Sequence, residues 1–427
     1  MSHLTPNLAT IGQRPHGGPV GTRVCGVRVD ILSKEYPPAV YGGAGVHVEE
    51  LTRALRARGD VDVQVRAFGA PRDEPGTTGY PDLPELSHAN AALKTLGVDV
   101  AIAADCEGAD LVHSHTWYAN MAGHLGSLLA GAPHVISAHS LEPLRPWKAE
   151  QLGGGYRISS WVEKTAYEAA AAVIAVSHGM REDILKCYPS INPEHVPVVH
   201  NGIDSTDWQP DTSDAAKDIC RELGLDPDKR SVLFVGRITR QKGLPHLLRA
   251  AASLEPDVQL VLCAGAPDTP EIQREVEGLM DDLRKTREGV VLIAEHLPRN
   301  KVIALESHAT VFACPSVYEP LGIVNLEAMA CDAAVVATRT GGIPEVVVPG
   351  ETGWLVDIEQ VQDGTGTPVD PAAFEADLAA TLNEALSDPA RAREMGQAGR
   401  RRAVEHFSWS AIGDRTMEVY RSVLDRS

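Results

Sequence analysis

The stretch Val29-Asp-Ile-Leu-Ser-Lys-Glu-Tyr-Pro-Pro-Ala-Val-Tyr-Gly-Gly-Ala-Gly45 decides how the chain folds. It begins in an apolar run, residues 28–32, that predicts a buried β-strand, and it leads into an amphipathic stretch, residues 46–58, that predicts a helix. The Gly42-Gly43 pair lies between them. Glycines at such a turn let backbone N–H groups approach an anion, and the helix N-terminus adds partial positive charge. The pattern suits a pyrophosphate-bearing ligand, although a tight turn in any Rossmann-like domain has the same order of elements.

Similar short β-rich runs alternate with helical stretches along most of the chain. Such alternation predicts parallel sheets covered by helices on both faces, and two series of strands predict two doubly wound domains. The loop-forming residues between 201 and 230 separate the two series. The expected strands are residues 28–32, 61–67, 111–114, 134–138, 173–176 and 196–200 in the first series, and 232–235, 259–264, 290–293, 310–314, 334–338 and 354–356 in the second.

Composition excludes several classes of function. The 427 residues carry a net charge of −19, which disfavours nucleic acid as the main partner. No apolar run reaches the roughly 18–20 residues that span a membrane, and no secretory signal precedes the first strand. Seven cysteines without a CxxC pair favour a reducing compartment. We therefore expect a cytoplasmic protein that acts on small molecules, without a membrane partner, and a homodimer is left open.

The segment Phe234-Val-Gly-Arg-Ile-Thr-Arg-Gln-Lys-Gly243 follows the first strand of the second series. Arg237 and Lys242 are five residues apart in a loop flanked by glycines. Two cations so placed can clamp a diphosphate and offset its charge as it leaves. The alternative is a pair of solvated surface cations. The glycines, and the position directly after a strand, favour the diphosphate.

The segment from Pro315 to Ala330 contains two carboxylates, Glu319 and Glu327. Glu319 precedes Pro320, which favours the first turn of a helix and would place Glu327 two turns later on roughly the same face. Carboxylates suit sugar recognition because they accept hydrogen bonds from hydroxyl groups. The alternative is one capping carboxylate and one exposed helical glutamate.

Together, the two cations and the two carboxylates resemble the donor-binding signature of GT-B glycosyltransferases of the glycogen synthase and GT4 type. The resemblance extends from about residue 24 to the C-terminus. It implies two Rossmann-like domains that face each other across a cleft, and transfer with retention of anomeric configuration. The implied divisions are a leader at 1–23, an acceptor-binding domain at 24–205, a nucleotide-sugar-binding domain at 206–400, and a helix at 401–427 that packs back on the first domain.

The same resemblance assigns roles in the donor site. Arg237 and Lys242 would contact the donor diphosphate, Glu319 the transferred sugar and Glu327 the ribose hydroxyls. His139, at the end of a strand, matches the cleft histidine of the family, although a lone histidine at a strand end is more often structural. Backbone groups of His296 and Leu297 would read the adenine. The remaining donor contacts are expected at Gly42, Gly43, Leu321, Gly322 and Ile323.

His113-Ser-His115 is a candidate metal pair, because residues i and i+2 of a strand share a face. A catalytic zinc ion needs three protein ligands, and no third ligand is recognisable by spacing. We therefore expect no metal and no cofactor besides the donor substrate. That donor is expected to be ADP-glucose, because the segment 29–45 is most similar to ADP-glucose-dependent members of the family.

Two acceptors remain open. Longer bacterial glycogen synthases carry KxGGL at the first turn, whereas this chain has Val40 and Ala44 at the Lys and Leu positions. That departure favours transfer to glucose 1-phosphate, giving α-maltose 1-phosphate for α-glucan synthesis, over extension of a glucan by a glycogen synthase. A phosphorylated acceptor needs cations in the first domain. The predicted phosphate ligands are Arg157, which opens a helix after three glycines, with Ser140 and Thr116; Arg145 and Lys148 are weaker candidates.

Two other reactions on the same fold are alternatives to transfer onto glucose 1-phosphate or a glucan. A lipid or inositol-phosphate acceptor is one, but a lipid-directed enzyme would usually carry a basic amphipathic helix, and none stands out in the sequence. A sugar-nucleotide 2-epimerase is another, because the fold alone does not define the reaction.

Overall fold

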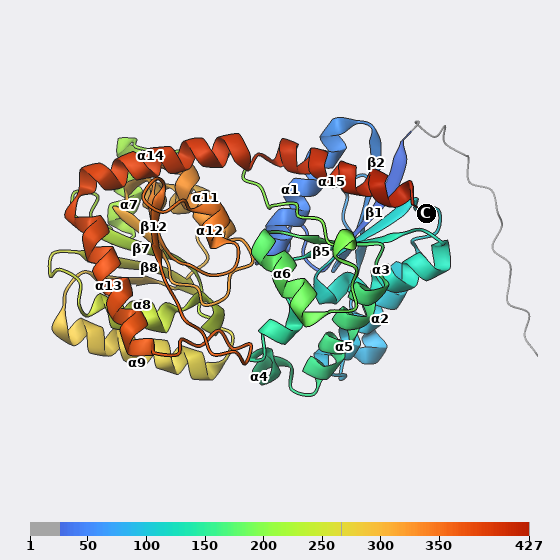
Figure 1. The fold of residues 1–427 in the computed structure, drawn as a ribbon, viewed down its shortest axis with the longest axis horizontal. Coiled ribbons are helices and arrows are strands. Elements are labelled where there is room, and N and C mark those ends of the chain that lie inside the picture. The colour runs from blue at the N-terminus through green and yellow to red at the C-terminus, as the bar shows by residue number, and fades with distance from the viewer. Residues whose placement is uncertain (1–25, 266, 427) are drawn as a thin grey trace, which may run out of the picture.

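Each half of the chain forms a six-stranded parallel sheet. The computed structural model describes residues 26–265 and 267–426, and the two halves lie beside each other (Figure 1). The expected leader, 1–23, lies outside the described residues. Among the described helices, none is both long and apolar enough to cross a membrane.

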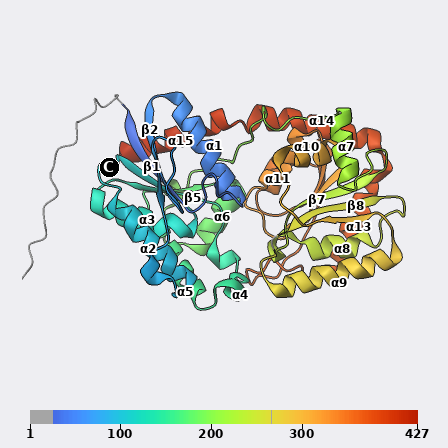
Figure 2. The ribbon, with the colours of Figure 1, turned by 180° about the vertical axis from the view of Figure 1, so that it is seen from behind.

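The N-terminal sheet has the strand order β3-β2-β1-β4-β5-β6. Its strands are β1 (Val27–Ser33), β2 (Val61–Phe68), β3 (Thr77–Tyr80), β4 (Leu111–His115), β5 (His134–Ala138) and β6 (Ala172–Ala175). Its helices are α1 (Gly43–Arg58), α2 (Ala91–Ala104), α3 (Thr116–Ala130), α4 (Lys148–Leu152), α5 (Gly155–Ala169) and α6 (His178–Cys187). Helices α2, α3 and α5 cover one face of this sheet (Figure 2), and α1 lies on the other.

The C-terminal sheet has the equivalent order, β12-β11-β10-β7-β8-β9. Its strands are β7 (Ser231–Arg237), β8 (Gln259–Gly265), β9 (Val290–Ile293), β10 (Val311–Cys314), β11 (Ala334–Thr338) and β12 (Gly353–Val356). Its helices are α7 (Asp214–Glu222), α8 (Leu244–Ala251), α9 (Pro270–Thr286), α10 (Arg299–His308), α11 (Ile323–Ala330), α12 (Ile343–Val346), α13 (Pro371–Ser387) and α14 (Pro389–His406). Both orders are the doubly wound arrangement of dinucleotide-binding folds.

The C-terminal helices tie the two domains together. Helix α14 packs on the C-terminal domain, and α15 (Trp409–Leu424) lies on the N-terminal domain against α1 (Figure 1). The crossing falls at Phe407 and Ser408, where Ile203 pairs with Ser408. The returning helix therefore begins eight residues after the expected start at 401, because residues 401–406 continue α14.

Burial explains why the strands were recognisable. Strands β4, β5, β6, β10 and β11 are buried along their whole length, so they read as continuous apolar or small-residue runs. Two expectations were wrong. Residues 196–200 form only an isolated bridge between Ala175 and Val198, and β3 was missed because its sequence, Thr-Thr-Gly-Tyr, has no apolar run.

Candidate active site

Five of the predicted site residues, Gly42, Gly43, Arg237, Lys242 and Glu319, end or follow the strands at which the strand order of each sheet reverses. In the N-terminal sheet this point lies between β1 and β4, and in the C-terminal sheet between β7 and β10. Ligands of doubly wound sheets bind at such switch points, outside the carboxyl ends of the strands. A Cβ built on Gly43, after β1, would lie 3.5 Å from the Ile323 side chain of the other domain. The two switch points therefore face each other.

The two predicted donor cations lie at the end of β7. Arg237 is the last residue of that strand, and its Nη1 donates to Asp268 Oδ1 at 2.9 Å. Lys242 ends a short 3₁₀ turn, and its Nζ contacts Glu319 Oε2 at 2.7 Å. Gly243 follows with φ 65°, and a Cβ there would lie 1.9 Å from the carbonyl oxygen of Pro315. Only glycine allows this loop to pack against the segment that carries Glu319.

The Lys242–Glu319 pair is almost removed from solvent. The Glu319 side chain is 8% exposed and that of Lys242 20% exposed. Burial alone would lower the pKa of Lys242, but the Glu319 carboxylate raises it above its ordinary value. Lys242 is therefore held as a cation beside a carboxylate that also accepts from Ser316 Oγ at 3.1 Å. This geometry brings together two residues that the sequence separates by 77 positions.

The predicted helical position of Glu319 was wrong. Helix α11 begins at Ile323, and Glu319 lies in the preceding turn. Gly322 caps the helix with φ 95°, a conformation that disfavours any residue with a Cβ and that ends the turn before the helix starts. The loop after β11 also fixes this turn, because the Gly342 N–H donates a hydrogen bond to the Glu319 carbonyl oxygen at 3.0 Å.

Glu327 lies inside α11 beside other buried groups. Burial raises its pKa to about 7, and the charges of Arg299 and Lys242 oppose that rise. Leu321 is buried before the helix, and Ile323 is half-buried at its start. His296 and Leu297 follow β9, with His296 exposed and the Leu297 side chain buried. All of these residues lie at the carboxyl edge of one sheet, where the resemblance places the nucleotide.

The Gly42-Gly43 turn binds a carboxylate that was not predicted there, that of Glu35. Glu35 Oε2 accepts hydrogen bonds from the N–H groups of Tyr41, at 3.0 Å, and Gly42, at 2.8 Å. A Cβ on Gly45 would lie 2.7 Å from the same oxygen. Gly42 therefore gives its amide to a carboxylate of the chain itself. Gly43 is the glycine that faces the other domain, because a Cβ built on it would meet Ile323 and no other residue that the structure describes.

His139 follows β5 and belongs to a group of histidines. Its Nε2 lies 3.0 Å from His115 Nδ1, and its ring lies edge-on to that of His47 with centroids 4.6 Å apart. The sequence analysis paired His115 with His113 and found no third ligand. In the structure His113 is engaged elsewhere, by Tyr420 Oη at 2.6 Å and Ser137 Oγ at 2.9 Å. His47, which spacing could not reveal, completes a set of three with His115 and His139.

The N-terminal domain gathers cations around Tyr118, on α3. Lys34 Nζ lies 3.7 Å from the Tyr118 ring centroid, and Lys148 Nζ lies 5.5 Å from it. Neither ammonium forms an ion pair with a carboxylate in the described part of the chain. Arg145 Nη1 donates to Ser140 Oγ at 3.0 Å, and its charge is among those that act on Lys148. Burial, and then the charge of Arg145, lower the pKa of Lys148 to about 8.

Of the three predicted phosphate ligands, Ser140 contacts this group of cations, because its Oγ accepts the hydrogen bond from Arg145. Thr116 is two residues before Tyr118, at the start of α3, and has φ 62°. A positive φ is strained for a β-branched residue, and such strain clusters at functional sites. Arg157 is exposed on the first turn of α5, and its guanidinium makes no hydrogen bond or ion pair with any residue that the structure describes. Lys34 was missed, although its position directly after β1 is the signal that could have found it.

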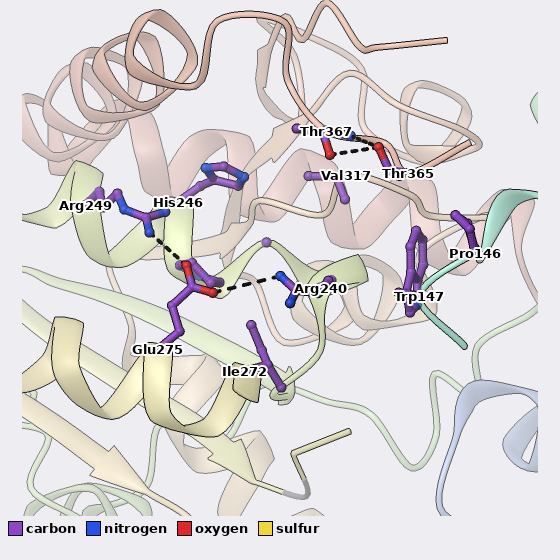
Figure 3. A pocket seen from close by; sticks show the side chains of 12 residues that line it. Pro146, Trp147, Arg240, His246, Arg249, Ile272, Glu275, Val317, Thr365 and Thr367 are labelled. Atoms are coloured by element: carbon purple, nitrogen blue, oxygen red, sulfur yellow. Dashed lines mark hydrogen bonds and ion pairs between the residues drawn. The ribbon is translucent and has the colours of Figure 1, made fainter. Parts of the chain in front are cut away.

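A cavity of about 530 Å³ opens beside the loop that carries Lys242 (Figure 3). Pro146 and Trp147 of the N-terminal domain face Arg240 of the C-terminal domain across it. Glu275 binds Arg249 at 2.8 Å and Arg240 at 3.9 Å on its floor. Gly243 lines the cavity from the C-terminal domain, and Trp147, next to Lys148 in sequence, lines it from the N-terminal domain.

Known families match both domains. The family model described as "Glycosyltransferase Family 4" matches residues 41–207, and that described as "Glycosyl transferases group 1" matches residues 216–402. The chain belongs to this family of glycosyltransferases and has its two-domain GT-B fold.

Among its relatives is an α-maltose-1-phosphate synthase of Mycolicibacterium smegmatis, 56% identical over 93% of this chain and 100% of that protein. A glycogen synthase of Mycobacterium tuberculosis is 27% identical over 92% of this chain and 94% of that protein. The solved sucrose-phosphate synthase of Thermosynechococcus elongatus is 27% identical, with a TM-score of 0.72 over 94% of this chain and 100% of that structure.

Proposed function

We propose that the protein transfers glucose from ADP-glucose to glucose 1-phosphate and forms α-maltose 1-phosphate with retention at the anomeric carbon. The similarity to α-maltose-1-phosphate synthases, at roughly twice the identity seen with the glycogen synthase, supports this choice. The proposal includes no metal or cofactor in the reaction. It places the enzyme in the cytoplasm, which the six free cysteines in the described part of the chain favour.

The observation that carries the acceptor is the pair of ammonium groups of Lys34 and Lys148 that lie near the Tyr118 ring. Lys148 is 7% exposed and Lys34 is half-buried. Neither forms an ion pair among the described residues, although the charges of nearby carboxylates act on both. A buried charge without a partner is costly, so it persists where a ligand supplies the opposite charge. A phosphate group on the acceptor supplies it, whereas the neutral end of a glucan does not.

The donor is positioned from the other side of the cleft. Arg237 and Lys242 would hold the diphosphate, and Glu319, fixed by Lys242, would accept a hydrogen bond from the transferred glucose. Glu327 would accept hydrogen bonds from the ribose hydroxyls. Gly43 would let the sugar-phosphate approach α1 without a side chain between them. The backbone of His296 and Leu297 would contact the base.

The reaction follows from these positions. The bond between the anomeric carbon and the β-phosphate oxygen breaks, and the 4-hydroxyl oxygen of glucose 1-phosphate bonds to the same carbon on the same face. The hydroxyl proton passes to an oxygen of the departing ADP. Negative charge grows on that phosphate, and Arg237 and Lys242 stabilise it in a site from which closure of the domains excludes water. The His139 ring, half-buried at the end of β5, would contact the glucose.

The deciding experiment is product analysis with ADP-glucose and glucose 1-phosphate, compared with ADP-glucose and glycogen. We expect a disaccharide phosphate to form much faster than glucan grows. Efficient glucan extension without use of glucose 1-phosphate would contradict the proposal and make the enzyme a glycogen synthase. Inversion at C2 of the donor sugar, with no transfer to either acceptor, would make it an epimerase.

A further inference from the structure

Three histidines from separate elements meet beside the cleft. His47 lies on the first turns of α1, His115 ends β4, and His139 follows β5. One ring nitrogen of each lies within 4.8 Å of those of the other two. The ring centroids are 5.4 Å apart for His47 and His115, and 5.3 Å apart for His115 and His139. His115 and His139 lie at the ends of neighbouring strands, and α1, which follows β1, brings His47 to them.

Two of these rings have a nitrogen without a partner. His47 Nε2 and His115 Nε2 are buried and make no hydrogen bond to any described residue. His47 is 2% exposed, and His115 is completely buried. An unsatisfied buried polar atom is costly, and its presence in a native structure indicates a missing partner such as an ion or a ligand group.

The protein also sets which nitrogen of His47 is free. His47 Nδ1 lies 2.7 Å from Asn201 Oδ1, which can only accept, so Nδ1 carries the proton and Nε2 keeps its lone pair. Metal-binding histidines are usually oriented by such a hydrogen bond on the second ring nitrogen. A neutral imidazole with a free lone pair is the form that binds a metal.

We propose that His47, His115 and His139 form a binding site for a divalent transition-metal ion, with Zn²⁺ as the expected ion. Three imidazoles suit Zn²⁺, and the absence of a carboxylate from the set disfavours Mg²⁺ and Ca²⁺. At a Zn–N distance of about 2.0–2.1 Å, tetrahedral ligand nitrogens lie roughly 3.4 Å apart, so small ring rotations suffice. A tetrahedral ion with three protein ligands leaves a fourth position for water.

The consequence for activity rests on the proposed function. His139 is the residue of the set that contacts the transferred glucose in that proposal. A bound metal holds the His139 ring against His47 and His115 and places a hydrated cation where the sugar of the donor enters. The site is therefore inhibitory, and Zn²⁺ competes with ADP-glucose.

Binding is tested without any substrate. The full-length enzyme is treated with a chelator, dialysed and titrated with CoCl₂ and with ZnCl₂, by visible absorption and by calorimetry. We expect one equivalent of Co²⁺ to give the intense visible bands of a low-coordinate nitrogen site, and one equivalent of Zn²⁺ to displace it. The variant His47→Gln should weaken Zn²⁺ binding at least ~10-fold, as should Asn201→Ala through loss of the orienting bond. His88→Gln, an exposed histidine elsewhere, is the matched control and should bind as the wild type does.

Several results would overturn the assignment. They are less than one equivalent of bound Zn²⁺ in the wild type, a weak octahedral Co²⁺ spectrum, or unchanged binding in a folded His47→Gln variant. Zn²⁺ that binds but does not raise the KM for ADP-glucose, or a chelator that abolishes turnover, would refute the inhibitory role. Failure of the proposed acceptor leaves the metal titration unaffected, so the two failures are distinguishable.

Discussion

Replacing Lys148 by Met tests whether its ammonium group binds the phosphate of the acceptor. At about 4 Å and an effective dielectric constant of about 20, one pair of unit charges interacts by about 4 kcal/mol. After desolvation, a hydrogen bond to a charged group contributes about 1.5–3 kcal/mol. We therefore expect kcat/KM for glucose 1-phosphate to fall roughly 10- to 100-fold, with the KM for ADP-glucose nearly unchanged.

The same substitution should affect stability in the opposite direction. Burial lowers the pKa of Lys148 from 10.5 to about 8, and that difference corresponds to roughly 3 kcal/mol at most. Because the folded-state pKa is depressed, the cation costs stability below about pH 8, and the cost disappears as pH rises toward 10.5. Lys148→Met should thus have a higher Tm than the wild type at pH 7, and the difference should shrink in alkali.

Steady-state kinetics in both substrates and thermal unfolding at several pH values measure both effects. Lys164→Met is the matched control, because that side chain is 62% exposed and makes a loose ion pair, with its Nζ 4.0 Å from Glu168 Oε1. Wild-type kcat/KM for glucose 1-phosphate in Lys148→Met, or a Tm that falls as it would on loss of a core contact, would refute the reasoning.

Three further predictions concern the donor site and a buried carboxylate. Arg237→Ala should lower kcat by about 10²–10³-fold and leave Tm nearly unchanged, because the side chain is 43% exposed; turnover and unfolding assays check this. The KM for ADP-glucose should rise as pH falls below about 7, where Glu327 takes up a proton, and Glu327→Gln should remove that dependence in a pH series. Burial, and then the charge of Glu142, raise the pKa of Glu163 from 4.5 to about 8. The wild-type Tm should therefore fall as pH rises from 4.5 to 8, and Glu163→Gln should remove this dependence of Tm on pH.

Each of these has a result that would contradict it. Near-normal turnover of Arg237→Ala would remove that residue from the donor clamp. A KM for ADP-glucose that stays flat from pH 8 to pH 6 would mean that ionised Glu327 does not bind the ribose. Glu163 accepts from the Glu142 N–H at 2.8 Å and from the Tyr188 hydroxyl at 2.5 Å, and a Gln oxygen keeps both bonds. A Glu163→Gln variant that unfolds earlier at pH 8 would therefore show that the negative charge itself stabilises the fold.

The segments that carry the predicted donor residues were recognisable because each is local to the end of one strand. Arg237 ends β7, Lys242 follows it, and Glu319 follows β10. Parallel strands all end at the same edge of a sheet, and adjacent strands at a switch point therefore bring such segments together without further information. The helical position of Glu319 failed for a local reason, because Gly322 ends the turn before α11 begins.

The sequence by itself thus determined the two doubly wound domains, their order and the position of Arg237, Lys242 and Glu319 at strand ends, since periodicity and turn chemistry are properties of neighbouring residues. Only the tertiary structure decided the rest. It placed Lys34 and Lys148 around one tyrosine ring, and it gave the Gly42 amide to Glu35. It also brought His47 from α1 to the ends of β4 and β5, because such groupings depend on how a helix packs over a sheet, which no spacing along the chain records.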